Sequence, residues 1–526
     1  MIEDMRELLT AHPEFKSKLF CRGFLLTDAD IDEEAYPFYG LWNSYRVLNK
    51  TLLVHPEQHA FIQQTETNTM ILIGHAYNPF TMDSDENSIL KNLLYAYTVN
   101  TENWTNRLNE LTGLFVLIVF YHDMVKLYCD CAGMQIVYYG FANKNLYITS
   151  HMQLVGDLCN LSPKSYVQHL LKYRFYSIYG AYLPGDLSTY DELRRLVPNT
   201  FVTIFNSNIQ IKRFYPTQPI PAIADEQQYH ATIRKIGEIL HNNLFLIPQK
   251  WKRPAISLTG GMDSKATLAS ANGLYEKFLY FSYASMPGEA IDADAAHKIA
   301  QAIGVSHQID KISDIDSDFE NIDVVRSVIY HNYGRIGNQN TNDIRKRAYY
   351  QKHPYFDVEV KSWVSEIGRA NYYKKFGFRK MPQSLSPRQM STLYKFFLND
   401  RRLLQQTDRI FAQYIKDVAF DQLSGIDSSD MFLWEVRYGS WGGQVITSEH
   451  KYSYDITIPY NNRNLIELLL SLPLEKRIND QVHQDLIACM NPLIDQTGIT
   501  ITNYNETSVR MWKEKLYYLV NTHIPW

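Results

Sequence analysis

Short runs of apolar residues, separated by turn-forming residues, dominate the chain from residue 20 to about 215, and this pattern predicts strands. Two segments, 88–97 and 165–173, instead place apolar residues at three- and four-residue spacing, which is typical of helices. We therefore expect an α+β domain over residues 1–215. The segments predicted to be strands are 18–24, 70–74, 115–121, 126–131, 136–139, 145–150, 201–205 and 209–214.

A proline-rich stretch, 215–221, follows this half of the chain. Three prolines in six residues disfavour a helix, so residues 216–226 are expected to form an extended linker. Beyond it, strand patterns alternate with helical patterns, which predicts an α/β domain with a doubly wound parallel sheet over residues 227–526, mostly helical after about residue 320. The alternating segments are the helix 227–246, the strand 254–258, the helix 265–272, the strand 278–282 and the helix 290–303.

Composition narrows the class of protein. The chain has 526 residues with 52 basic and 56 acidic side chains spread along it, so neither nucleic acid nor a membrane surface is an expected partner. The longest apolar run, 114–121, is well below the roughly 20 residues needed to span a bilayer. Five cysteines, a sparse and odd number, and an acidic N-terminus without a signal-peptide pattern indicate a cytoplasmic protein.

The strand predicted at 254–258 runs into the sequence Thr-Gly-Gly-Met-Asp-Ser, residues 259–264, and then into a helix. Two glycines let the backbone approach a ligand closely, and the N-terminus of the helix offers unpaired N–H groups, so the turn is expected to bind phosphate. Glycines in such a turn can also serve tight packing alone. Three side chains that suit phosphate or metal within six residues, Thr259, Asp263 and Ser264, favour the binding site.

This turn resembles the pyrophosphate-binding loop Ser-Gly-Gly-x-Asp-Ser of the ATP pyrophosphatase group, with Thr259 in place of the usual serine. The resemblance implies that ATP is split between its α and β phosphates, that pyrophosphate stays in the loop, and that Asp263 holds Mg²⁺. Ser282, at the end of the next predicted strand, is included in the expected ATP site. The residues expected to bind ATP are Thr259, Gly260, Gly261, Asp263, Ser264 and Ser282.

Several strings resemble asparagine synthetases, which join a class II glutamine amidotransferase domain to a synthetase domain. Residues 108–118 are similar to the family's Gly-x-Phe-x-Phe strand, 146–150 to its LLFASE strand, and 458–473 to VPFLDHRLVEFALSLP. The matches follow the family's order over roughly residues 70–475. They imply an Ntn-like β-sandwich domain followed by a domain like the adenine nucleotide α-hydrolases.

The chain departs from this family where glutamine would be hydrolysed. Ile2 stands where the family has its nucleophilic cysteine, and Ile73 stands where an asparagine amide would stabilise the oxyanion. Cys21 resembles the family's opening cysteine displaced by about 20 residues, so it is either a buried strand cysteine or a nucleophile exposed by removal of a leader. Loss of the nucleophile also occurs in β-lactam synthetases and lasso-peptide cyclases, which use an amine of the substrate.

The resemblance also implies that the substrate carboxylate is first activated as its adenylate and then transferred to an amine. Candidate residues for this second half-reaction come from the same resemblance. Glu366 matches the acid near the acyl-adenylate, which would orient or deprotonate the amine. Arg369, Ala370 or Asn371 falls where the family has its second magnesium-binding aspartate. Arg369 is therefore either a cation for phosphate or a surface residue.

Glu435 and Arg437 lie in an aromatic, glycine-rich stretch where the family binds its acyl substrate. An aromatic helix end packed on the core would have the same composition. The family's catalytic lysine follows the last strand of the synthetase domain, but residues 501–506 contain none, and Lys513 and Lys515 are the nearest candidates.

Together these features predict an AMP- and pyrophosphate-forming carbon–nitrogen ligase that uses ATP and Mg²⁺. Its expected substrates are a small-molecule or peptide carboxylate and an amine that does not come from glutamine hydrolysis, as in the biosynthesis of a specialised metabolite or modified peptide. Two alternatives remain open: a catalytically inactive scaffold of the same fold, and another ATP pyrophosphatase chemistry such as tRNA thiolation. The lack of a basic patch and of a suitable cysteine pair disfavours thiolation.

Overall fold

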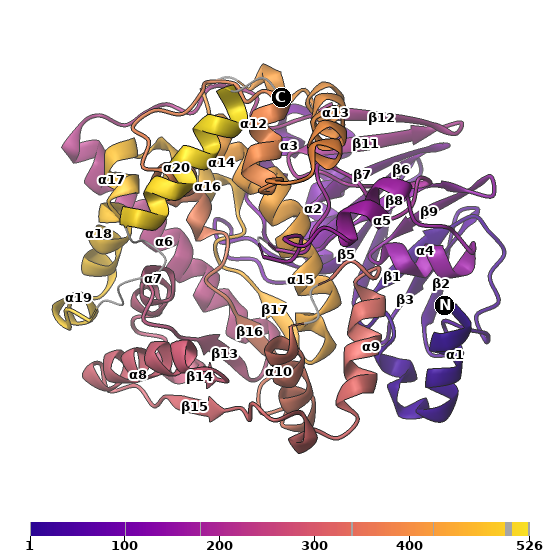
Figure 1. Ribbon diagram of the computed structural model, residues 1–526, viewed down its shortest axis with the longest axis horizontal. Helices are drawn as coiled ribbons and strands as arrows, with labels where there is room; N and C mark the ends of the chain where they lie inside the picture. The colour runs from indigo at the N-terminus through magenta and orange to yellow at the C-terminus, as the bar shows by residue number, and fades with distance from the viewer. Residues whose placement is uncertain are drawn as a thin grey trace.

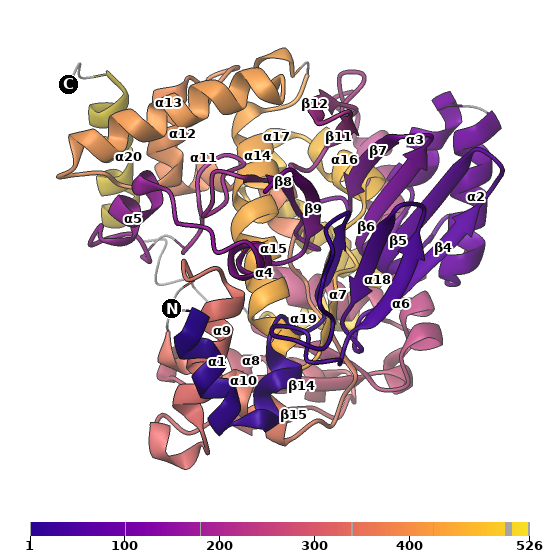
Figure 2. The same cartoon turned by 90° about the vertical axis from the view of Figure 1, so that its right-hand side faces the viewer.

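Two six-stranded antiparallel sheets form the N-terminal half of the computed structural model, which describes residues 2–99, 101–178, 180–337, 340–423, 425–499 and 508–523 (Figures 1 and 2). The first sheet has the order β10-β8-β9-β1-β3-β2 and the second β12-β11-β7-β6-β5-β4. Their strands are β1 (Phe24–Thr27), β2 (Asn43–Val47), β3 (Lys50–Val54), β4 (Ala60–Gln64), β5 (Asn68–Tyr77), β6 (Thr112–Tyr121), β7 (Met124–Cys129), β8 (Tyr138–Ala142), β9 (Asn145–Thr149), β10 (Leu193–Arg195), β11 (Thr200–Phe205) and β12 (Asn208–Arg213).

The side chains of each strand point alternately to its two faces, and this explains why the two sheets pack face to face. Ile71 and Ile73 of β5 and Ile118 of β6 point to the same buried cluster as Phe24 and Leu26 of β1 in the opposite sheet. Side chains two residues apart share a face of a strand, so these positions form the interior of a sandwich. The outer face of the second sheet is covered by α2 (Glu86–Val99) and α3 (Thr101–Asn109), as Figure 2 shows.

A five-stranded parallel sheet organises the second half of the chain. Its order is β15-β14-β13-β16-β17, and Ile256 of β13 is aligned with Tyr280 of β14 on one side and Val360 of β16 on the other. The chain therefore adds strands outward from β13 in one direction and then returns to the other side, the order expected of a doubly wound sheet. The strands are β13 (Pro254–Ser257), β14 (Leu279–Ala284), β15 (Gln308–Lys311), β16 (Val358–Val360) and β17 (Asp455–Thr457).

Helices surround this sheet and make up most of the C-terminal part (Figure 1). The helices α12, α13 and α20 pack together. Outside the two sandwich helices given above, the α-helices are α1 (Ile2–Ala11), α4 (Met152–Leu158), α5 (Ser165–Leu171), α6 (Glu226–Lys250), α7 (Met262–Ser270), α8 (Pro287–Ala302), α9 (Ile322–Asn332), α10 (Thr341–Lys352), α11 (Asn371–Phe376), α12 (Pro387–Tyr394), α13 (Arg401–Asp417), α14 (Ser428–Phe432), α15 (Gly443–Ser448), α16 (Arg463–Ser471), α17 (Leu474–Ile478), α18 (Gln481–Met490), α19 (Pro492–Gln496) and α20 (Ser508–His523). Among the described helices, none is at once long enough and apolar enough to cross a bilayer.

Buried polar contacts join the sandwich to the parallel-sheet half. Asn461 donates to the Gly113 carbonyl at 2.7 Å and to Asp130 at 2.8 Å. Glu435, fully buried, accepts two hydrogen bonds from Arg213, at 2.6 and 2.9 Å. Residues 214–225 between the two halves contain neither helix nor strand, and the domain boundary at 216–226 remains a prediction.

Most predicted elements are confirmed, but the segment 18–24 is not a strand. Residues Pro13–Lys18 form a 3₁₀ helix, η1, and the first strand begins only at Phe24. Phe20 and Arg22 both have positive φ angles, which no strand accommodates. The sequence patterns also missed β2, because four of its five residues are exposed and show no apolar alternation.

The contact between Arg213 and Glu435 gives a test of how the two halves are joined. Arg213→Met is expected to lower the free energy of unfolding by about 3–5 kcal/mol, because it leaves a buried carboxylate without its cation. The double variant Arg213→Met, Glu435→Leu should recover most of this loss. Chemical denaturation measures both.

Lys298→Ala is the matched control, because Lys298 is 60% exposed and pairs with Asp294 one helical turn away. Such a surface pair contributes less than about 1 kcal/mol. If Arg213→Met costs no more than the control, the buried pair does not hold the two halves together.

Candidate functional site

The Thr-Gly-Gly-Met-Asp-Ser loop lies at the carboxyl end of β13, the strand at which the order of the parallel sheet reverses. In open α/β sheets, ligands bind outside the carboxyl ends of the strands at such a reversal. A cavity of about 320 Å³ is found here, between the loop, the end of β14, α8 and the segment that follows β16. Five residues predicted from the sequence line it: Thr259, Asp263, Ser264, Ser282 and Glu366.

Hydrogen bonds of two hydroxyl side chains, with each other and with the backbone, give the loop its shape. The Ser264 hydroxyl donates to the Thr259 carbonyl at 2.8 Å and accepts from the Thr259 N–H at 3.1 Å. The Gly261 N–H donates to the Thr259 hydroxyl at 3.2 Å. These bonds fold the loop back over the start of α7, so that both hydroxyls lie at the N-terminus of that helix.

A carboxylate also lies beside the loop. Asp292 of α8 lines the same cavity, and the backbone N–H of Gly260 acts to lower the pKa of its carboxyl, although burial raises that pKa overall. No side chain forms a capping hydrogen bond at the N-terminus of α7, because the N-cap residue is Gly261. Unpaired N–H groups at a helix N-terminus favour anions, so the loop is suited to bind phosphate oxygens.

Asp263, the predicted magnesium ligand, is held by protein groups. Arg369 donates to its Oδ2 atom, and Ser365 donates to its Oδ1 atom at 2.6 Å. His483 Nε2 lies 3.3 Å from the same Oδ1. Burial alone would raise the pKa of this carboxyl, but Arg369 and the two groups on Oδ1 hold it well below its usual range.

These contacts do not fit a resident magnesium ion. Mg²⁺ takes oxygen ligands in near-octahedral geometry, usually one or two carboxylates together with water and phosphate. Here the single carboxylate of the loop faces a guanidinium, which occupies the side from which a cation would approach it.

Glu366 lies on η4 (Ser365–Arg369), a 3₁₀ turn after β16. Val364 and Ala370, on either side of it, have φ angles of 77° and 50°. A β-branched residue at such an angle is strained, and strain of this kind gathers at functional sites. The turn thereby directs Ser365, Glu366 and Arg369 towards the loop after β13.

Burial and the nearby negative charge of Asp263 raise the pKa of Glu366 from 4.5 to about 7. The hydroxyl of Tyr438 donates a hydrogen bond to its Oε2 atom. A carboxyl with a pKa near 7 can both accept and return a proton at neutral pH. Glu366 is thus suited to act as a general base beside the loop.

Tyr438 belongs to an unusual π-helix, η6 (Leu433–Gly442), where the sequence suggested an ordinary helix end. Arg437, on the same element, stacks over Trp441 at 5.4 Å, and its charge interacts with that of Glu366. π-helices are rare and often occur at functional sites. Arg437 therefore lies near the cavity, although it does not line it.

Two other predicted residues lie elsewhere. Glu435 is buried in the contact with Arg213 described above, where it also accepts from Asn199 at 3.1 Å. Lys513 is an exposed residue of α20, apart from the cavity at β13. Residues 501–506, where the resemblance places the family's lysine, lie outside the described residues.

Lys361, a buried cation in the cavity wall, was not predicted from the sequence. Its ammonium group donates to Glu359 at 2.8 Å and lies 5.2 Å from the centre of the Trp363 ring, which stacks on Trp441. Burial lowers the pKa of Lys361, although Glu359 opposes this. The sequence does contain a signal for it: Glu359 and Lys361, of opposite charge, alternate with valines at the end of β16.

Cys21 and Ile73, the two described residues that the sequence resemblance relates to the glutaminase site, are packed inside the protein. Cys21 is 1% exposed, its thiol donates weakly to the Lys451 carbonyl at 3.5 Å, and burial raises its pKa. Ile73 points into the interior of the sandwich. The side chain of His75 is buried 3.2 Å from the Thr457 hydroxyl. The side chain of Ile2 lies outside what the structure describes.

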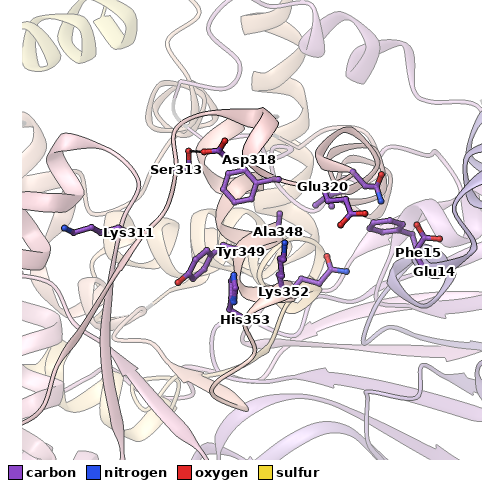
Figure 3. Close-up of a pocket in the computed structure, with 14 residues that line it drawn as sticks. Glu14, Phe15, Lys311, Ser313, Asp318, Glu320, Ala348, Tyr349, Lys352 and His353 are labelled. Atoms are coloured by element: carbon purple, nitrogen blue, oxygen red, sulfur yellow. Dashed lines mark hydrogen bonds between the residues drawn. The ribbon is translucent and has the colours of Figure 1, made fainter.

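A larger cavity of about 670 Å³ lies between η1, β15 and the helices α9 and α10 (Figure 3). Phe15, Lys311, Lys352 and His353 are among its lining residues. A third cavity of about 700 Å³ lies between α1, α4, α5 and α9. Neither contains a residue predicted from the sequence to bind ATP or substrate.

The raised pKa of Glu366 predicts how stability depends on pH. The folded protein holds this proton more tightly than the unfolded chain, so its contribution to stability is complete below about pH 4.5 and is lost as the pH rises through about 7. Relative to Glu366→Gln, the wild-type protein should lose up to about 3 kcal/mol of stability over that range, at about 1.4 kcal/mol per pKa unit. Denaturation curves recorded at several pH values measure the difference.

Replacement of the exposed Glu276 by Gln serves as the control and should leave the pH profile of the wild type unchanged. Parallel profiles for the wild type and Glu366→Gln would show that Glu366 ionises normally and is no base at neutral pH.

Comparison with protein-family models and with curated protein sequences finds no match. Among solved structures, the chain is similar to a glutamine phosphoribosylpyrophosphate amidotransferase from B. subtilis complexed with ADP and GMP, at 10% identity and a TM-score of 0.23 over 76% of each chain. It is similar to an allosteric regulatory enzyme of purine biosynthesis at 11% identity and a TM-score of 0.24, over 51% of this chain and 60% of that one. A glutamine-dependent NAD⁺ synthetase from Acinetobacter baumannii, in complex with ADP, shares 12% identity at a TM-score of 0.20, over 49% of this chain and 62% of that one. Similarity this low supports no conclusion about the function of the protein.

Proposed function

We propose that the protein is an ATP-dependent carbon–nitrogen ligase that forms AMP and pyrophosphate as it joins a carboxylate to an amine. The observation that carries this proposal is the position of the Thr-Gly-Gly-Met-Asp-Ser loop at the strand-order reversal, with Glu366 in the same cavity. The loop supplies an anion site and Glu366 supplies a base with a pKa of about 7. A ligase of this kind needs both.

The first half-reaction requires that the phosphates of ATP be bound and their charge neutralised. The N–H groups of the loop and of the first turn of α7 would bind the departing pyrophosphate. The carboxylate oxygen of the substrate attacks the α-phosphorus, and the bond to the β-phosphate oxygen breaks. Lys361 in the cavity wall adds a positive charge to this side of the site.

In the second half-reaction the amine nitrogen attacks the acyl carbon and AMP leaves. The amine loses a proton in this step, and Glu366 is the group suited to take it. Tyr438 positions Glu366 through its hydrogen bond, and the charge of Arg437 acts on the same carboxyl. We propose Glu435 as a residue that supports the fold rather than one that contacts substrate, because Arg213 and Asn199 already engage its carboxylate.

An inactive scaffold of the same fold is the second candidate. The ion pair between Arg369 and Asp263 favours the scaffold, because the charge of the carboxylate predicted to bind Mg²⁺ is already neutralised by a protein group. Identification of the nucleotide products separates the two proposals, since a scaffold forms no AMP.

Turnover is expected to release pyrophosphate and AMP in equal amounts. Protein would be incubated with ATP, Mg²⁺ and a fractionated cell extract that supplies carboxylates and amines, and the nucleotides would be separated by ion-exchange chromatography. Glu366→Gln should lower the rate by about 10²–10⁴-fold, as for loss of a general base, while Glu276→Gln should have no effect. ADP and phosphate as the stoichiometric products would contradict the proposal.

Glutamine is not expected to serve as the source of nitrogen. With Cys21 buried and Ile73 turned into the sandwich, added glutamine should yield no glutamate, and Cys21→Ala should change neither this result nor the ligase rate. Enzymatic assay of glutamate measures the outcome. Glutamate that appears with the wild type and disappears with Cys21→Ala would mean that Cys21 is a nucleophile.

A further inference from the structure

Asp263 is satisfied as a hydrogen-bond acceptor before any ligand binds. Oδ2 accepts from Arg369, while Oδ1 accepts from Ser365 at 2.6 Å and lies 3.3 Å from His483 Nε2. Arg369 and Ser365 both present donors to this carboxylate. A metal site instead gathers acceptor atoms around a cation.

Arg369 is fixed in this position by a second carboxylate. Its Nε donates to Asp480 Oδ1 at 2.8 Å, and Asp480 also pairs with Lys374. Among the described residues, the remaining N–H groups of Arg369 make no hydrogen bond. A guanidinium has five donors in a rigid plane, and this geometry suits phosphate oxygens.

The backbone around Arg369 is also arranged for this contact. The turn η4 is bounded by positive φ angles at Val364 and Ala370, and Gly368 lies so close to Leu469 that a Cβ would come within 2.8 Å of it. Residues held in strained angles persist only where the surrounding structure imposes them. The conformation of η4, the turn that carries Arg369, is therefore fixed by the structure around it.

We propose that the guanidinium of Arg369 takes the position of a metal ion beside Asp263, so that the loop binds pyrophosphate through a cation of the protein. This inference rests on the proposed function, and it names how that site neutralises phosphate. Mg²⁺ still enters as part of the ATP complex, but Asp263 does not bind it. A divalent ion on Asp263 would lie next to a positive guanidinium, and the two charges would repel each other.

The first experiment measures pyrophosphate binding by calorimetry, in EDTA and in excess Mg²⁺, with the free concentration corrected for the magnesium complex. The wild type should bind in both conditions with similar affinity. Arg369→Ala should lose about ten- to hundredfold in EDTA, the value of one or two charge-assisted hydrogen bonds. Arg253→Ala is the control, because Arg253 is 52% exposed and does not line the cavity, and it should bind like the wild type.

The second experiment titrates Mn²⁺ and follows it by electron paramagnetic resonance, without nucleotide. The wild type and Asp263→Asn should bind the same amount of Mn²⁺, which would show that Asp263 holds none. Arg369→Asp replaces the cation with a carboxylate and should gain a site that binds additional Mn²⁺. Thermal unfolding checks that each variant is folded. The comparison of wild type with Asp263→Asn decides the question even if Arg369→Asp does not fold.

The inference would be overturned if pyrophosphate bound only in the presence of Mg²⁺ and if the wild type bound Mn²⁺ that was lost in Asp263→Asn. The proposed ligase function would not be affected by this result. Failure of the wild type to bind pyrophosphate or ATP in any condition would instead contradict the proposed function. The Mn²⁺ titration would then decide alone whether Arg369 excludes a metal from Asp263.

Discussion

The reversal of strand order at β13 is the constraint on which the site depends. Strands are added to one side of β13 and then to the other, so the segments that follow β13 and β16 leave the sheet next to each other. A cavity forms between them because the chain does not cross from one to the other. Every group in the proposed chemistry, from the hydroxyls of Thr259 and Ser264 to Glu366, is brought there by one of these two segments or by an element packed on them.

Electrostatic balance within this cavity explains the unequal behaviour of its two carboxylates. Asp263 faces Arg369 and stays ionised, whereas Glu366 is buried beside the charge of Asp263 and binds its proton up to about pH 7. Two acids that share one cavity are thus given different roles by their neighbours. The cation that fixes the first of them belongs to η4, the same turn that carries the second.

The loop was predictable from sequence because its chemistry is local: two glycines, two hydroxyls and an acid lie within six residues. The strands and helices with a regular apolar periodicity were predictable for the same reason, since this periodicity reflects one element at a time. The partners of Asp263 were not, because Arg369 and His483 lie more than 100 positions away and meet it only through the fold. The 3₁₀ helix before Phe24 was missed because the apolar residues there pack without a strand's backbone angles.

Glu435 and Lys513, which the resemblance places at the site, do not line the cavity at β13. Glu435 lies in a suitable stretch of sequence, but the buried Arg213 comes from the other half of the chain and engages it. Lys513 is one of the lysines nearest to residues 501–506 along the chain, and it is exposed on α20. Membership in the asparagine synthetase family and the two domain types remain predictions from the sequence resemblance, and the ligase activity is a proposal argued from the cavity at β13.

Hydrogen–deuterium exchange measured with and without ATP tests most directly whether that cavity is the nucleotide site. The account predicts slower exchange in peptides that cover residues 257–270 and 361–369, because ATP would engage the loop N–H groups and the turn η4 together. Protection confined to the cavity between η1, α9 and α10, around Phe15 and His353, would contradict it, as would the absence of any protection at saturating ATP.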